Sequence, residues 1–176
     1  MATLYTIGHS TRTIEELIAA LQAHEIKTLV DIRAFPMSRR LPHFNRENLQ
    51  TSLGDAGIRY VWMKELGGMR KKSLEHSPNV ALRNASFRNY ADYMLTAEFE
   101  RAIFEVTRLG EEARTAYMCA ERVYFKCHRM LVSDWLVAHG HEVLHIDDEK
   151  PPKPHKLMAD ARLIDGKVFY RGDRLL

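Results

Sequence analysis

Short apolar runs alternate with amphipathic stretches along the 176-residue chain, and this alternation restricts the possible folds more than any other feature. Runs typical of strands lie at residues 3–8, 27–33, 58–63, 114–119 and 141–146. Stretches with helical periodicity lie between them, at residues 13–24, 45–57, 87–110 and 127–140. Strands that alternate with helices are typical of an α/β domain with a mainly parallel sheet. We predict one three-layer domain over residues 1–176, with about five strands and with helices on both faces.

Local signals refine this outline. Thr13 and Glu16 have the spacing of a capping box, and Asn45 and Gly57 are suited to begin and end the second helix. The longest irregular stretch covers roughly residues 62–87, a length more typical of a functional lid than of a plain connection. Residues 3–147 form the predicted core. Residues 148–176 form an extension with an irregular proline-rich segment at 151–154 and a hairpin over 161–172 that turns on Asp165-Gly166.

Composition excludes several classes of protein. No apolar run approaches the ~20 residues that span a membrane, and the first residues lack the features of a signal peptide. Two cysteines are too few for a disulfide scaffold, so we expect a reducing, cytoplasmic location. The net charge is only +3, but residues 33–88 hold 11 Lys and Arg against 4 Asp and Glu, a local excess of +7. We therefore expect an anionic small molecule or a nucleic acid as ligand, and no membrane.

Polar clusters follow every predicted strand, at residues 8–12, 31–40, 64–72, 119–129 and 145–149. Ligands of open parallel sheets bind beyond the carboxyl ends of the strands, so we expect these clusters to share a cleft. Polar loops without a site are the alternative. The turn after the first strand has neither a GxGxxG nor a GxxxxGK[ST] pattern, so no nucleotide cofactor is indicated.

Residues 119–129 are the densest of these clusters. Cys127 stands where a helix begins and is followed by His128 and Arg129, a setting that lowers the pKa of a thiol. The spacing of Cys119, Cys127 and the arginines matches neither the loop of cysteine phosphatases nor a C-x-x-C motif. Cys119, Cys127 and His128 are weak candidates for metal ligands, but no standard zinc spacing is present, so we predict no metal site. We expect the cysteines to line the cleft rather than to perform the chemistry.

Further residues are suited to bind an anion. Asp31 and Arg33 lie two residues apart in a strand and hence on one side, where they either meet a substrate or pair with each other. Ser10 either helps to bind an anion or is a plain helix cap. The predicted substrate-binding residues are Gly8, Ser10, Arg33, Ser38, Gly67, Gly68 and Arg129.

The segments YTIGHS, LVDIRAFPMS, ELGG, YMCAERVYFKCHRMLVSDWL and VLHI occur here in the order seen in the domain of unknown function 488 family, which this chain resembles from Tyr5 to about Ile146. The block from Cys119 to Arg129 is the most specific part. The resemblance implies a Rossmann-like α/β fold and a bacterial or archaeal cytoplasmic protein, and it implies no reaction. The family pattern leads us to expect a proline between Glu121 and Cys127, where this chain has RVYFK.

Our leading hypothesis is an enzyme that acts on a phosphorylated or nucleic-acid-derived substrate. In it, Glu121 or Asp31 is the general base, His128 or His9 is the acid, and Cys127 has a supporting or nucleophilic role. Two alternatives remain open. One is a non-catalytic nucleic-acid-binding module whose stacking partners are Phe35, Phe44, Tyr60 and Trp62. The other is a metal or redox sensor built on the two cysteines.

Overall fold

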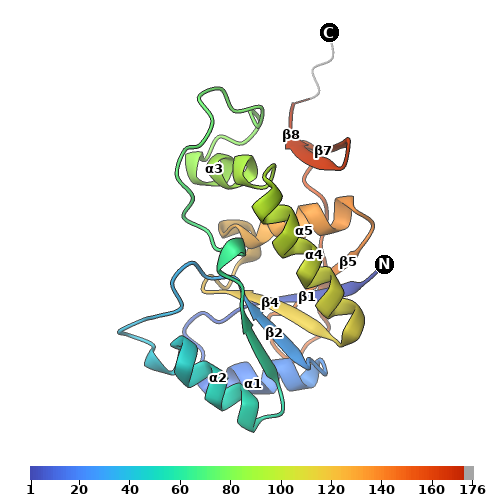
Figure 1. The fold of residues 1–176 in the computed structure, drawn as a ribbon. Helices are drawn as coiled ribbons and strands as arrows, with labels where there is room; N and C mark the ends of the chain where they lie inside the picture. Colours follow the sequence, from blue (N-terminus) through green and yellow to red (C-terminus); the bar gives the residue numbers. More distant parts are fainter. Residues whose placement is uncertain (173–176) are drawn as a thin grey trace.

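Five parallel strands form the centre of the molecule, and a short sixth strand is added at one edge (Figure 1). In this computed structural model, which describes residues 1–172, the order across the sheet is β3-β2-β4-β1-β5-β6. β6 runs antiparallel to β5, and all other neighbours are parallel. The strands are β1 Thr3–Gly8, β2 Thr28–Asp31, β3 Arg59–Trp62, β4 Thr115–Cys119, β5 Glu142–His145 and β6 Lys153–Pro154.

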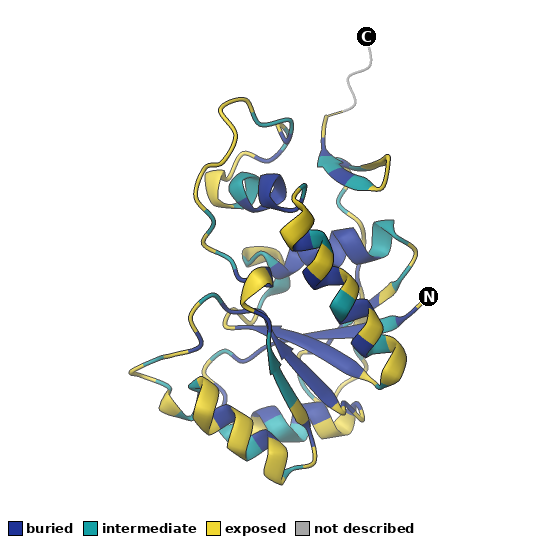
Figure 2. Cartoon of the chain, in the orientation of Figure 1, coloured by how far each residue is buried: buried dark blue, intermediate teal, exposed yellow. Residues whose placement is uncertain are grey.

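Helices cover both faces of the sheet, which confirms the predicted α/β class (Figure 1). α1 Ile14–Ala23 and α2 Arg46–Asp55 pack on one face, where Leu17, Leu21, Leu49 and Leu53 are fully buried. α3 Ala85–Tyr93, α4 Ala97–Glu112 and α5 Arg129–Ala138 lie on the other side, with Phe99, Ile103, Leu131 and Trp135 in the core. The central strands are buried along their length, as in a sheet that is covered on both sides (Figure 2). Over residues 1–172, no helix combines the length and the hydropathy that crossing a membrane requires.

Short-range signals in the sequence identify several element boundaries correctly. The Thr13 hydroxyl accepts from the Glu16 amide, and the Glu16 carboxylate accepts from the Thr13 amide, as a capping box requires. The C-terminal hairpin pairs β7 Ala161–Ile164 with β8 Lys167–Tyr170. Its turn residues Asp165 and Gly166 both have positive φ angles, 50° and 78°, which a two-residue hairpin turn needs. Residues 173–176, the end of the predicted extension, lie outside the described residues.

Three predicted elements differ from the structure. The single helix over residues 87–110 is wrong: α3 ends at Tyr93, and Thr96 begins α4 by accepting a hydrogen bond from the Phe99 amide. α5 begins at Arg129 and not at Cys127. The proline-rich segment is not wholly irregular, because β6 pairs with β5 at the edge of the sheet, where proline is tolerated.

The long loop between β3 and α3 is anchored to α3 and to the C-terminal hairpin. It contains a short 3₁₀ helix, η2 Lys64–Leu66, and then no helix or strand before α3. The fully buried Asn79 donates a hydrogen bond to Asp92 Oδ1 of α3 at 2.8 Å and accepts one from the Tyr170 amide of β8 at 2.8 Å. Earlier in the loop, the Leu66 carbonyl accepts from the Tyr90 hydroxyl of α3 at 2.8 Å, so α3 holds the loop on both sides of its middle.

The chain leaves the carboxyl ends of β1 and β4 towards opposite faces of the sheet. It runs from β1 to β2 through α1 on one face, and from β4 to β5 through α5 on the other. β1 and β4 are neighbours, with Gly8 opposite Cys119, so the two connections separate to opposite faces at this edge. The order differs from the 3-2-1-4-5 order of dinucleotide-binding Rossmann domains, so the likeness to that fold lies in the layers.

A buried hydrogen-bond network joins the C-terminal extension to the sheet. Asp134 of α5 accepts from the Tyr170 hydroxyl at 2.9 Å, and its other oxygen lies 2.7 Å from His155 Nε2. His155 Nδ1 lies 2.8 Å from His145 Nε2, and His145 Nδ1 lies 2.6 Å from the Thr6 hydroxyl. Burial, together with the neighbouring His155 and Arg129, lowers the pKa of His145 to about 3. His145 is therefore neutral in the folded protein at neutral pH.

This burial predicts a loss of stability in mild acid. Above about pH 6.5 His145 is neutral whether the chain is folded or unfolded, and it contributes no pH dependence. Below that pH only the unfolded chain takes up the proton, so the free energy of unfolding falls by about 2 kcal/mol by about pH 5. Urea unfolding at both pH values should show a smaller loss for His145→Gln than for the wild type. His76→Gln, at an exposed histidine, should leave the loss unchanged. Equal losses in the wild type and in His145→Gln would contradict this origin.

Candidate active site

A cavity of about 340 Å³ lies at the carboxyl edge of the sheet. Loops that follow β2, β3 and β4 form most of its wall, and α3 closes one side. The lining residues are Arg33–Phe35, Gly68 and Met69, Cys119–Glu121, Lys126–His128, and Ser86, Phe87 and Tyr90 of α3.

The structure brings part of the predicted site together around this cavity. Those that line it are Arg33, Gly68, Glu121, Cys127 and His128, along with Cys119. The others do not line it: Gly8, His9, Ser10, Asp31, Ser38, Gly67 and Arg129. Ser38 instead ties its own loop, because its hydroxyl accepts from the Leu41 amide at 3.1 Å. Gly67 lies against the backbone of the β2 loop, where an added Cβ would come 2.7 Å from Ala34 Cα.

Asp31 and Arg33 pair with each other, which is one of the two arrangements that the sequence allowed. The Asp31 carboxylate is fully buried and accepts from Arg33 Nε at 2.9 Å and from Nη2 at 2.7 Å. The Tyr60 hydroxyl donates to the same carboxylate at 2.5 Å, and burial next to this charge raises the pKa of Tyr60. These partners occupy the carboxylate, so Asp31 is not free to act as a general base. Its visible effect is to hold the guanidinium of Arg33 at the cavity wall.

The turn after β1 is hydrogen-bonded to the end of β4 and to the loop that follows it. The amides of His9 and Ser10 donate to the carbonyls of Cys119 and Ala120, both at 2.9 Å, so neither amide is free to bind an anion. Both nitrogens of the His9 ring are engaged: Nδ1 donates to the Ser10 carbonyl at 2.8 Å, and Nε2 accepts from Arg33 Nη1 at 3.4 Å. Burial lowers the pKa of His9 to about 4, which keeps the ring neutral. A Cβ on Gly8 would overlap the Glu121 carbonyl, so only glycine permits this contact.

The two cysteines lie side by side at one wall of the cavity. Their sulfur atoms are 2.8 Å apart, and the Arg129 amide, the first of α5, donates to Cys127 Sγ at 3.2 Å. The hydrogen bond from Cys119 lowers the pKa of Cys127 well below its ordinary value, against the opposing effect of burial. His128 and Arg129 add to the lowering. The same hydrogen bond and burial raise the pKa of Cys119, so the pair consists of a thiolate at 127 and a thiol at 119.

His128 is held in one orientation next to that thiolate. Its Nε2 lies 3.0 Å from the Ile32 carbonyl, which can only accept, so Nε2 carries a hydrogen atom. The ring packs on Tyr90 of α3, with centroids 4.9 Å apart, and an added Cβ on Gly68 would come 2.9 Å from Nδ1. A hydrogen bond with the His128 side chain is among the causes that lower the pKa of Cys127, and since Nε2 is engaged, Nδ1 is the nitrogen available for it. Nucleophile, base and orienting group are the three parts of an activated cysteine.

Arg129 braces the loop that carries Glu121. It is 1% exposed, and its Nη2 donates to the carbonyls of Glu121 at 3.1 Å and Arg122 at 2.9 Å. Its Nη1 lies 3.4 Å from the Thr6 hydroxyl, and its Nε has no hydrogen-bond partner among the described residues. The predicted anion-binding guanidinium is thus committed to backbone carbonyls. Its positive charge still acts on Cys127 from behind the cavity wall.

A metal ion would need three or more suitably grouped side chains of histidine, cysteine, aspartate or glutamate. The described part of the chain has no such group. Among the weak candidates, His128 Nε2 is bound to the Ile32 carbonyl, and the sulfur atoms of Cys119 and Cys127 are bound to each other by a hydrogen bond.

Several lining residues were absent from the predicted site. Lys126 is adjacent to Cys127, and its place inside the densest polar cluster was a usable signal. Tyr90 has no such signal, because the sequence predicts that its segment belongs to one long helix. The buried network of Asp134 and His155 was also missed, since these residues meet only through β6.

Comparison with known proteins agrees with the resemblance seen in the sequence. A family model described as domain of unknown function DUF488 matches residues 13–136, which is more than half of the chain. The chain belongs to the DUF488 family. The matched region of this DUF488 protein contains every residue that lines the cavity, and it ends before β5 and the C-terminal extension. No curated protein and no solved structure matches the chain.

Gly68 offers a direct test of the Cys127–His128 contact. In Gly68→Ala the new Cβ displaces the His128 ring, so we expect iodoacetamide to alkylate Cys127 about tenfold more slowly near pH 6.5. Mass spectrometry of the intact protein measures the rate. Gly54→Ala in α2 is the matched control, because nothing lies within 4 Å of its Cβ and its helix should gain up to about 1 kcal/mol. An unchanged rate in Gly68→Ala would show that His128 does not activate Cys127.

Proposed function

We propose that this DUF488 protein is an enzyme that acts on a phosphorylated or nucleic-acid-derived substrate in the cavity, with Cys127 as its reactive group. The observation that carries the proposal is the set of contacts around Cys127 Sγ. The Arg129 amide lies at 3.2 Å, the Cys119 thiol lies at 2.8 Å, and His128 stands beside it with its other nitrogen fixed by Ile32. These contacts favour a nucleophilic role for Cys127 over the lining role that we expected from the sequence.

The reaction class that fits is displacement through a covalent intermediate. The Cys127 thiolate forms a bond to the electrophilic atom of the substrate, the bond to the leaving group breaks, and the leaving group takes the proton held on His128. Water then gives a proton back to His128, and the resulting hydroxide releases the product from the sulfur. Arg33 and Lys126 are the cations at the cavity wall that can hold an anionic group. Glu121 is exposed at the rim, where it is available to bind the incoming water or a substrate hydroxyl.

Asp31 and His9 become positioning residues in this proposal, because their polar atoms are bound to Arg33, Tyr60 and Ser10. We also propose a cytoplasmic location, since a reactive thiolate needs a reducing compartment.

A substrate screen with a matched pair of variants tests this function. Phosphomonoesters, nucleotides and short single strands of DNA and RNA are incubated with the reduced protein, and products are followed by mass spectrometry. We expect turnover by the wild type, none by Cys127→Ser, and a kcat reduced roughly 10²- to 10⁴-fold in His128→Gln. Cys119→Ser should retain turnover, because the serine hydroxyl can donate the hydrogen bond that the Cys119 thiol gives to Cys127. Full activity of Cys127→Ser on a substrate found in this way would remove Cys127 from the mechanism.

A second candidate function, binding of single-stranded nucleic acid, is favoured by the surroundings of Phe35. A second hollow of about 640 Å³ is lined by residues 34–37 and 45–48 and by Trp62. Ala34 and Phe35 line both this hollow and the active-site cavity, so the two are neighbours on either side of Phe35. Phe35 is 73% exposed, and the Arg46 guanidinium lies 4.7 Å from the centre of the Trp62 ring. An exposed ring between two hollows is a suitable platform for a base.

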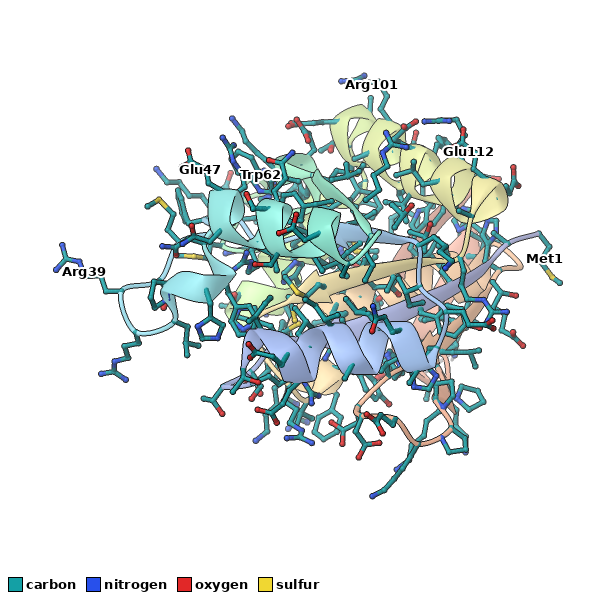
Figure 3. All side chains as sticks on the ribbon, turned by 90° about the horizontal axis from the view of Figure 1, so that it is seen from below. Met1, Arg39, Glu47, Trp62, Arg101 and Glu112 are labelled. Carbon is teal, nitrogen blue, oxygen red and sulfur yellow. The ribbon has the colours of Figure 1, made fainter. Side chains whose placement is uncertain are left out.

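The charge of the same region complements a polyanion. The local excess of +7 over residues 33–88 includes cations exposed to solvent, namely Arg39, Arg40, Lys64, Lys71 and Lys72. Arg39 projects away from the body of the molecule, on the side opposite Met1 (Figure 3). Of the four aromatic residues first considered for stacking, Phe44 is fully buried and the Tyr60 hydroxyl is bound to Asp31. Phe35 and Trp62 are therefore the two aromatic residues of this set that can still stack on a base.

Fluorescence anisotropy with labelled single strands tests this second function. We expect Phe35→Ala to weaken binding about tenfold at low salt, because one stacked base is lost, and all binding to weaken steeply as salt is added. Phe104→Ala is the control, since Phe104 is 57% exposed on α4 and lines neither hollow. Binding that is insensitive both to salt and to Phe35→Ala would exclude the two hollows beside Phe35 as a nucleic-acid site.

A further inference from the structure

The two cysteines have a geometry that goes beyond activation of one thiolate. Their sulfur atoms, 2.8 Å apart, are the only sulfhydryl groups in the chain, and both residues line the active-site cavity. A disulfide bond is about 2.05 Å long, so less than 1 Å of movement along the line between the atoms would join them. Both cysteines are free in the structure.

We propose that Cys119 and Cys127 form a reversible disulfide within one chain when a hydroperoxide enters the cavity, with Cys127 as the attacking sulfur and Cys119 as the resolving one. This site of modification rests on the placement of the two sulfur atoms and does not depend on the substrate proposed above.

The surroundings of the two sulfur atoms give them different roles. Cys127 is half-buried and is the thiolate, so it meets a reagent in the cavity first. Cys119 is 3% exposed, and its thiol keeps its proton, which it donates to the Cys127 sulfur at 2.8 Å. An attacking thiolate beside a protected thiol is the arrangement of a thiol pair that reacts in two steps.

The chemistry balances with the peroxide as the oxidant. Cys127 thiolate attacks one peroxide oxygen, the O–O bond breaks, and Cys127 becomes a sulfenic acid while the other oxygen leaves as hydroxide or alkoxide and takes up a proton. Cys119 then attacks the sulfenic sulfur, the S–O bond breaks, and the oxygen leaves as water with the proton of the thiol. With hydrogen peroxide, two thiols and one peroxide give one disulfide and two water molecules. A dithiol reductant returns both thiols by exchange.

The loop between the cysteines is braced so that this bond can form without unfolding. Arg129 holds the carbonyls of Glu121 and Arg122, and the His9 amide holds the Cys119 carbonyl. The backbone next to Cys119 is therefore held in place, and at the other end of the loop the Cys127 carbonyl accepts from the Met130 amide at 3.1 Å. The disulfide removes the Cys127 thiolate from the cavity and shields it from further, irreversible oxidation to sulfinic acid.

Peroxide treatment of the full chain tests the proposal. The reduced protein, freed of reductant, is treated with about one equivalent of hydrogen peroxide and its intact mass is measured. We expect the wild type to lose two hydrogen atoms, to remain monomeric by non-reducing electrophoresis, and to regain them with dithiothreitol. Cys119→Ser should instead gain one oxygen atom that dimedone traps, and then a second oxygen as sulfinic acid. Cys127→Ser should keep its mass, because the remaining thiol is buried and protonated.

Two results would overturn the proposal: sulfinic acid on Cys127 of the wild type at the same rate as in Cys119→Ser, or a disulfide only between chains. Cys119→Ala serves as a second variant, and circular dichroism checks that both variants are folded. Because the readout is mass and not turnover, a failed substrate screen leaves this result intact, and a missing disulfide leaves the proposed enzyme intact.

Discussion

The contact between the turn after β1 and the turn after β4 is the constraint on which the rest of the site depends. Gly8 lies directly against the Glu121 carbonyl, and the amides of His9 and Ser10 continue the pairing of the two strands beyond their ends. This contact fixes the Glu121 carbonyl, which in turn accepts a hydrogen bond from Arg129. Without the close approach that glycine allows, the buried guanidinium would lose this acceptor.

Two buried arginines at the carboxyl edge of the sheet differ in whether a carboxylate neutralises their charge. Arg33 is matched by the buried carboxylate of Asp31, whereas Arg129 is buried against carbonyl oxygens and a hydroxyl. A buried guanidinium without a carboxylate partner favours negative charge close by, and the Cys127 sulfur is the group beside it that can supply it. Burial is the main cause that lowers the pKa of His145, and the charge of Arg129 adds to the lowering. One buried cation thus contributes to the lowered pKa values of both Cys127 and His145.

The fold could be predicted from the sequence wherever a signal is local. The capping box at Thr13 and the turn at Asp165-Gly166 depend on neighbouring residues, and both are present. The break at Thr96 was missed because helical periodicity continues across it, and the cap outweighs the pattern. For the site, position after a strand predicts that Cys127, His128 and Glu121 lie near one another, and all three line the cavity. It could not separate residues that face the cavity from those that hold the walls, since Asp31, His9 and Arg129 occupy equivalent places in the pattern but point to internal partners. Tyr90 and His155 reach their partners only through tertiary packing.

The packing of the C-terminal hairpin determines when α5 becomes fully supported during synthesis of the chain. Val168 and Tyr170 belong to the same apolar cluster as Trp135, and the Tyr170 hydroxyl and His155 complete the bonding of Asp134 inside α5. The helix that follows the thiolate therefore lacks part of its support until residue 170 has left the ribosome. A growing chain that already displays both cysteines therefore completes the packing of α5 behind them only after residue 170 has emerged, and not when the cysteines themselves emerge.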